Sequence, residues 1–300
     1  KNGLPRKPLT KRRLKNLILN VLKNPFNMVV LVSLVILFCL IIIPLLTMIA
    51  NTFTLAQGEL RRVQGHVGDF TLYYWKYILA STLSGAVLWG PLKNSFICGF
   101  FTVLVSVPLG SVLAWLMIRT DIPGKKILGL LVTVPYMIPS WTKALAWLAM
   151  FRNSTSGADG FLAGMGIPIP DWLAYGPIAI VLCMSMHYYA FSYIMVSGAL
   201  RSINSELEEM GEIQGASKAQ ILRHITLPLI LPSVLSATVM TISKSIGTYG
   251  VPANLGNRIG YYTLATKMRN FIDQGPQSVG YAMSIVLVLL AALIIFSNQR

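Results

Sequence analysis

The chain has 300 residues, of which 54% are hydrophobic and only 12% are charged, and its mean hydropathy is +0.64. A soluble domain carries about 25% charged residues, so this composition excludes a soluble enzyme, a disordered chain and a collagen-like fibre. The 25 Lys and Arg exceed the 10 Asp and Glu by 15 charges, and all three cysteines lie in apolar stretches, which excludes a disulfide framework and a cysteine-rich metal site.

Apolar blocks of about 20 residues, the length that a helix needs to cross a bilayer, follow one another along the chain. They are bounded by charged residues or by clusters of Gly, Pro and Asn. We therefore predict an all-α polytopic membrane protein with six transmembrane helices, over residues 27–50, 95–118, 127–150, 177–200, 225–249 and 279–296. The first block is too long for a signal peptide and is expected to stay in the membrane.

The basic residues indicate how these spans are oriented. The tail over residues 1–26 carries eight Lys and Arg, and the segments after the second and fourth spans add three each. With Arg300, 15 of the 25 basic residues lie on one side, which the positive-inside rule assigns to the cytoplasm. We expect a multi-pass protein of the cell (inner, cytoplasmic) membrane with both termini in the cytoplasm and residues 51–94 outside it. The basic residues are expected to contact lipid headgroups rather than nucleic acid.

The cytoplasmic segment between the fourth and fifth spans holds four of the ten acidic residues within seven positions. Ser205 and Glu208 have the spacing of a capping box, which predicts that a short helix starts directly after Ser205. Gly215 is a helix-stop signal. Ser217 and Gln220 form a second capping box, which predicts another short helix before the fifth span.

The stretch EMGEIQGASKAQILRHITLPLILP resembles the EAA motif of the permease subunits of binding-protein-dependent ABC importers. In that motif Glu-Ala-Ala is followed after three residues by Gly, and after nine more by Ile, one residue and Leu-Pro. Met210 and Gly211 stand where the family has two alanines, whereas the other motif positions match at the required spacing: Glu209, Gly215, Ile225, Leu227 and Pro228. The resemblance extends over about residues 70–297, and SIGTYGVPANLG after the fifth span is similar to the ferric-iron, polyamine and thiamine branch.

The resemblance implies the fold of a type I ABC importer permease, with residues 95–297 as a transmembrane domain of five spans and 205–228 as its coupling segment. A coupling helix in this segment would seat in a cleft of a separate ABC ATPase subunit. The ATPase-coupling residues that it implies are Glu208, Glu209, Met210, Gly211, Gly215, Ala216, Ser217, Ile225, Leu227 and Pro228. The other implied partners are an extracytoplasmic solute-binding protein and a second permease unit. Because the chain begins with Lys and ends soon after the last span, we expect it to be a piece of a longer polypeptide whose other half is that second unit. Otherwise the second unit is a copy or a homologous subunit.

The sequence holds no G-x-x-x-x-G-K-[ST] loop, so the chain is not expected to bind ATP. We predict a transport subunit that is not itself an enzyme and binds no cofactor or metal, while the partner ATPase uses ATP and Mg²⁺. The alternative is a secondary transporter or channel that is not coupled to ATP. None of the ten acidic residues falls in a predicted span, which weighs against proton coupling.

Two lysines fall inside predicted spans, and both are expected toward the outer face of the membrane. They either extend to the membrane surface or face the aqueous path, and the nearby histidine either packs as a neutral side chain or lines that path. The candidate path residues are Lys143, His187, Lys244 and Tyr249. The cargo is expected to be ferric iron or its chelate, a polyamine, thiamine or a small anion, and the two lysines favour an anion or a chelate.

Overall fold

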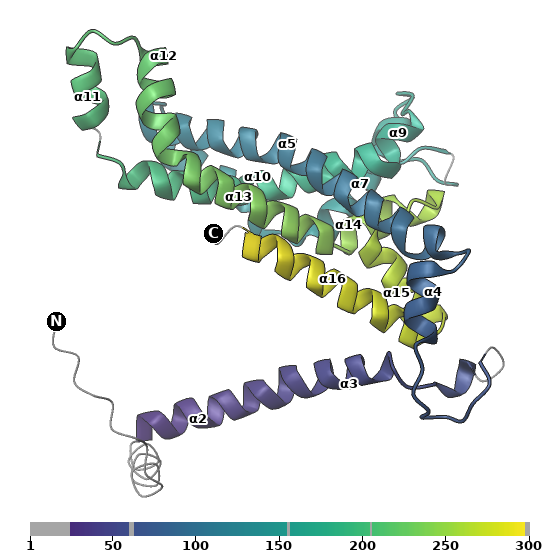
Figure 1. Ribbon diagram of the computed structural model, residues 1–300. Helices are drawn as coiled ribbons and strands as arrows, with labels where there is room; N and C mark the ends of the chain where they lie inside the picture. Colours follow the sequence, from purple (N-terminus) through teal and green to yellow (C-terminus); the bar gives the residue numbers. More distant parts are fainter. Residues whose placement is uncertain (1–24, 60–62, 155–156, 205, 298–300) are drawn as a thin grey trace, which may run out of the picture.

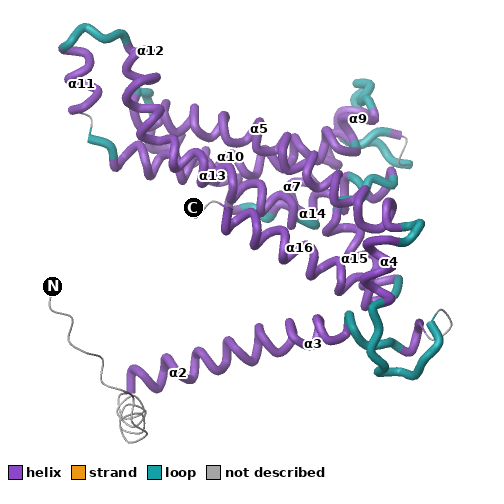
Figure 2. The backbone as a smooth tube through the Cα atoms, in the orientation of Figure 1, coloured by secondary structure: helices purple, strands orange, loops and turns teal. Residues whose placement is uncertain are grey.

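The computed structural model describes residues 25–59, 63–154, 157–204 and 206–297, and this part of the chain is almost entirely helical. Five of its helices are long and apolar enough to cross a membrane: Pro25–Asn51, Gly85–Arg119, Asp171–Ser202, Lys218–Gly247 and Gln277–Phe296. Figure 2 shows helices joined by loops, the longest of them between α3 and α4, so the predicted all-α fold is confirmed. Most of the predicted basic tail lies outside the described residues.

Figure 1 shows the order of the helices along the chain. The first long helix consists of α2 (Pro25–Leu37), a π-helical turn η1 (Phe38–Ile42) and α3 (Ile43–Asn51). The bundle that follows contains η2 (Gln57–Glu59), α4 (Tyr73–Ala80), η3 (Gly85–Trp89), α5 (Gly90–Arg119), α6 (Lys125–Met137), α7 (Ser140–Phe151), α8 (Phe161–Gly164), α9 (Asp171–Ala174), α10 (Gly176–Ser202), α11 (Glu206–Ile213), α12 (Lys218–Ile221), η5 (Leu222–Thr226), α13 (Leu227–Gly247), α14 (Gly250–Leu255), η6 (Asn257–Ile259), α15 (Leu264–Gln274) and α16 (Gln277–Ser297).

The centre of the bundle is α10, which packs along α5 and also meets α13. A Cβ at Gly110 of α5 would lie only 2.4 Å from the carbonyl oxygen of Tyr189 and 2.8 Å from the Cβ of Ser192. The two helix backbones therefore touch at this glycine, as small residues allow in membrane helices. Next to this contact lies a buried apolar cluster formed by Ala114, Met117, Tyr193, Val196, Leu200 and Ile230.

The third predicted span, residues 127–150, is not one continuous helix. It forms two shorter helices, α6 and α7, separated by a break at Ile138 and Pro139. Proline disfavours the helical conformation of the residue before it, and Ile138 is indeed extended, with φ −81° and ψ 129°. The break leaves carbonyl groups at the end of α6 without helical partners, and these carbonyls become part of a polar cluster described below.

The first long helix projects away from the bundle, as Figure 1 shows. No side chain of α2 or α3 is buried, and the helix meets the bundle where α3 contacts α16. A helix with apolar side chains all around it requires apolar surroundings. This helix is therefore suited to contact with lipid or with another membrane subunit.

The connections between helices gather at two ends of the bundle (Figure 1). The segment with α11 and α12 lies at one end, whereas α4, α9 and α15 lie at the other. This arrangement fits the predicted topology, in which the segment between the fourth and fifth spans faces away from residues 51–94.

Candidate functional site

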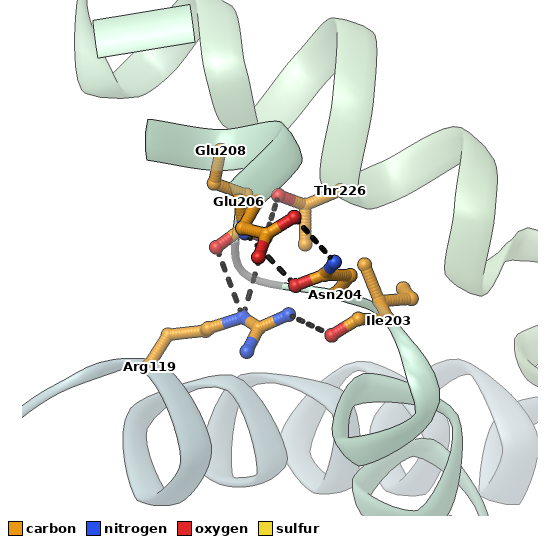
Figure 3. Close-up of polar contacts among 6 residues, drawn as sticks. All are labelled: Arg119, Ile203, Asn204, Glu206, Glu208 and Thr226. Carbon is orange, nitrogen blue, oxygen red and sulfur yellow. Dashed lines mark hydrogen bonds and ion pairs between the residues drawn. The ribbon is translucent and has the colours of Figure 1, made fainter. Parts of the chain in front are cut away.

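An asparagine side chain holds the first turn of α11 (Figure 3). Asn204 Oδ1 accepts a hydrogen bond from the backbone N–H of Glu206 at 3.2 Å, and Asn204 Nδ2 donates to the Glu206 carboxylate at 2.8 Å. Ser205, the predicted cap, lies outside the described residues. The helix begins at Glu206, directly after Ser205, as the sequence predicts.

A left-handed glycine ends α11. Gly215 has φ +82°, a conformation that costs an L-residue with a side chain roughly 1–2 kcal/mol. The N–H of Ala216 donates to the Gly211 carbonyl at 3.0 Å, and the N–H of Gly215 donates to the Glu212 carbonyl at 2.9 Å. This pair of bonds is the Schellman motif, so the predicted glycine stop is confirmed.

The second predicted capping box is also confirmed. Ser217 Oγ accepts a hydrogen bond from the Gln220 N–H at 3.4 Å, and Gln220 Oε1 accepts one from the Ser217 N–H at 2.8 Å. The helix that starts here does not end before the fifth span, however. It continues from α12 through η5 into α13, so that Lys218–Gly247 is one uninterrupted helix.

A π-helical turn explains how this helix continues past a proline. The N–H of Leu227 donates to the carbonyl of Leu222, five residues back. Pro228 has no N–H, and in a regular α-helix its ring crowds the carbonyl four residues earlier, that of His224. The wider turn directly before Pro228 relieves this crowding. What the sequence predicts as a short helix followed by a span is therefore a single helix that joins the coupling segment to the membrane.

An ion pair fastens α11 to the end of α5, as Figure 3 shows. Arg119 Nε lies 3.0 Å from Glu208 Oε2, and the two side chains are only 15% and 18% exposed. Thr226 Oγ1 donates to Glu208 Oε1 at 2.7 Å, and the Arg119 guanidinium also donates to the Ile203 carbonyl at 3.4 Å. Glu208 thus connects three helical elements, α5, α11 and η5.

Sequence reasoning missed two members of this network, Arg119 and Thr226. The sequence places Arg119 among the basic residues that orient the spans. It places Glu208 in a capping box and, through the family resemblance, among the ATPase-coupling residues, but it does not pair the two. The pair is 89 positions apart in the chain, and no local pattern signals so distant a contact.

The outer side of α11 exposes apolar side chains beside an unpaired carboxylate. The exposed fractions are 48% for Leu207, 56% for Met210 and 85% for Ile213. Glu209 is exposed and has no hydrogen-bond or ion-pair partner among the described residues. Exposed apolar side chains that lie together are typical of a surface that contacts another molecule.

Gly211, one of the two departures from the family motif, lies on the inner side of α11. A Cβ at this position would lie 3.2 Å from side-chain carbons of both Ile221 and Ile225, which is a tight contact. Glycine here lets α11 pack closely against the helix that follows. Of the other predicted coupling residues, Ala216 and Ile225 are half-buried, whereas Leu227 and Pro228 are exposed.

Three of the four predicted path residues come together around one tyrosine. Lys143 Nζ lies 2.6 Å from His187 Nδ1, and Lys244 Nζ donates to the Tyr136 hydroxyl at 3.1 Å. The rings of Tyr136 and His187 stack with their centroids 5.4 Å apart. Tyr249, the fourth predicted residue, is exposed and shows no hydrogen bond or ring contact with these residues in the described part of the chain. Sequence reasoning missed Tyr136, which is 108 positions from Lys244.

Comparison with known proteins gives one family and several relatives. The profile of the family described as "Binding-protein-dependent transport system inner membrane component" matches residues 106–300. The chain is 25% identical over 232 residues to the "Probable sulfate transport system permease protein cysT" of Marchantia polymorpha, which covers 75% of this chain and 77% of that one. It is 27% identical over 231 residues to the "Putative 2-aminoethylphosphonate transport system permease protein PhnV" of Salmonella typhimurium, which covers 77% and 79%.

Solved structures share the fold at lower identity. A chain of a bacterial ABC transporter involved in the import of the acidic polysaccharide alginate superposes with a TM-score of 0.70 at 17% identity, over 96% of this chain and 97% of that one. A chain of the MetNI methionine ABC transporter in an inward-facing conformation gives a TM-score of 0.56 at 23% identity, over 73% and 96%. Both similarities concern the fold.

Proposed function

Because the chain belongs to the family of binding-protein-dependent transport system inner membrane components, we propose that residues 206–228 couple its helices to a separate ABC ATPase subunit. The chain is the permease of an ABC importer with the type I fold, and thus a transport subunit. The alternative, a transporter or channel independent of ATP, gains no support from this membership.

The observation that carries the proposal is the way in which residues 206–228 are fastened to the bundle. Arg119 and Glu208 tie α11 to α5, and α12 continues without a break into α13. A displacement of α11 and α12 would therefore move two long helices together, which is what a lever between an ATPase and a membrane path requires. The exposed side of α11 offers apolar side chains and Glu209 to the ATPase.

The remaining partners follow from the same assignment. A second permease unit pairs with this chain, and a loaded solute-binding protein docks at the end of the bundle opposite α11. Both termini and residues 206–217 lie on the cytoplasmic side of the cell membrane. The ATPases bind ATP and Mg²⁺, and this chain binds no cofactor. ATP binding closes the ATPases, and the movement of α11 and α12 opens the path outward.

The cargo that we propose is a small anion. Two relatives are named for sulfate and for 2-aminoethylphosphonate, and both compounds carry an oxyanion group. Among the cargoes considered from the sequence, ferric iron, polyamines and thiamine gain no support from these relatives. The pair of lysines near Tyr136 also favours an anion over a cation.

Co-purification with the cognate ATPase tests the coupling proposal. Ile213→Glu places a charge on the exposed side of α11 and is expected to weaken the complex at least about tenfold, the effect of removing one apolar anchor. Ile167→Glu is the matched control, because Ile167 is also exposed (46%) but lies in the connection between α8 and α9. Equal ATPase recovery with both variants would contradict the proposal.

A further inference from the structure

The polar cluster around Tyr136 lies where the break between α6 and α7 meets α10 and α13. Lys143 comes from α7, His187 from α10 and Lys244 from α13. The ligand that we infer for this cluster rests on the proposed function, because a cargo-binding cluster requires a path for cargo. The hydrogen bonds of each member show which groups remain free to bind.

Lys143 uses all of its donors inside the protein. An ammonium group has three N–H donors, and Lys143 Nζ contacts the carbonyl of Pro135, the carbonyl of Ile138 at 3.3 Å and His187 Nδ1 at 2.6 Å. The Pro135 carbonyl lies in the last turn of α6 and the Ile138 carbonyl directly follows that helix, where the break at Pro139 leaves them without helical partners. Lys143 is thus a fixed positive charge with no donor left for a ligand.

The contact with Lys143 also fixes the state of His187. An ammonium group can only donate, so Nδ1 accepts and the ring is neutral with its proton on Nε2. The ring also lies in hydrogen-bond contact with the backbone of Pro135, so it is held from two sides. We therefore do not count His187 among the donors that are free to bind a ligand.

Lys244 keeps donors free for a ligand. Its Nζ is bonded to the Tyr136 hydroxyl at 3.1 Å and lies 4.6 Å from the centroid of the Phe191 ring, and the side chain is exposed. Since no other hydrogen-bond partner is present in the described part of the chain, two N–H groups are available. The Tyr136 oxygen accepts from Lys244, so its own hydrogen is also free to donate.

The cluster therefore contains two positive charges and several free donors, without an anion. In the described ranges, ion pairs such as those between Arg119 and Glu208 and between Arg269 and Asp273 lie elsewhere. A charge inside a membrane protein is costly without a partner and commonly marks a substrate pathway. A ligand that only accepts hydrogen bonds and carries negative charge complements every free group of the cluster.

We propose that this cluster is a binding site for a small oxyanion within the translocation path. The Lys244 ammonium and the Tyr136 hydroxyl contact the anion directly. Lys143 is a positioning residue, because its charge is fixed inside the protein and its contact with Nδ1 holds the His187 ring that stacks on Tyr136.

Equilibrium binding of radiolabelled sulfate and inorganic phosphate to the full chain in lipid nanodiscs tests the site. At least one of these anions is expected to bind the wild-type chain, and Lys244→Gln is expected to weaken its binding about tenfold or more, because a hydrogen bond to a charged group is lost. Lys244→Arg should retain most of the binding. Tyr136→Phe keeps the ring stack and should weaken binding severalfold.

Lys267→Gln is the matched control. Lys267 also lies over an aromatic ring, 4.7 Å from the centroid of Tyr262, but belongs to α15. Binding by the wild-type chain that Lys244→Gln leaves intact, or the failure of both anions to bind the wild-type chain, would overturn the site. Co-purification of the ATPase is measured separately. A chain that binds the anion but does not recover the ATPase would refute the coupling proposal without contradicting the anion site.

Discussion

Replacing Arg119 with Gln removes the guanidinium that fastens α5 to α11. The ion pair measures 3.0 Å and its side chains are 15% and 18% exposed, so it lies between a surface pair, worth about 0–1 kcal/mol, and a buried one, whose loss costs about 3–5 kcal/mol. Glu208 keeps its 2.7 Å bond from Thr226, which limits the penalty. We expect the opening free energy of α11 to fall by about 2 kcal/mol.

Hydrogen–deuterium exchange of the amides in α11 measures this opening directly. A loss of about 2 kcal/mol corresponds to exchange about thirtyfold faster, at amides such as those of Gly215 and Ala216 that close the helix. Arg201→Gln is the control, because Arg201 is an exposed arginine in the last turn of α10 without an ion-pair partner in the described residues. Unchanged exchange in Arg119→Gln, or equal acceleration in both variants, would refute the fastening of α11 by this pair.

Three further substitutions and one control variant distinguish effects on ATPase docking from effects on folding. Glu209→Lys reverses an exposed charge and is expected to reduce ATPase co-purification at least about tenfold while the melting temperature is unchanged; equal recovery would contradict the docking role. Gly215→Val places a side chain on a backbone with φ +82°, which costs about 2 kcal/mol. It is expected to abolish the ATP hydrolysis that is coupled to transport, while a protease-protection assay shows that membrane insertion is preserved. Gly110→Val brings a Cβ to 2.4 Å from a carbonyl oxygen and is expected to lower the yield of monodisperse protein in size-exclusion chromatography, whereas Gly164→Val meets nothing within 4 Å and is expected to be tolerated.

Local sequence patterns predicted the features that depend on neighbouring residues. The glycine stop at Gly215 and the capping box of Ser217 with Gln220 each involve residues within one helical turn, and both are confirmed. Apolar block length likewise predicted the long helices, because a membrane span depends on about 20 consecutive side chains.

Features that depend on distant residues were not predictable in this way. The partner of Glu208 is 89 positions away, and Tyr136 meets Lys244 over 108 positions. Two prolines act through their own backbone chemistry, which hydropathy does not encode: Pro139 separates α6 from α7, whereas Pro228 is accommodated by a π-helical turn and interrupts nothing. The first creates the polar cluster, and the second makes α12 and α13 one helix.

Site-specific photo-cross-linking in membranes tests most directly whether α11 contacts the ATPase. A photo-reactive phenylalanine analogue replaces Ile213 at the exposed side of α11, and the same analogue replaces Phe161, an exposed residue of α8, as the control. We predict a cross-link from position 213 to the ATPase subunit and none from position 161. No ATPase adduct at position 213, or adducts of equal yield at both positions, would contradict the assignment of residues 206–228 as the coupling segment.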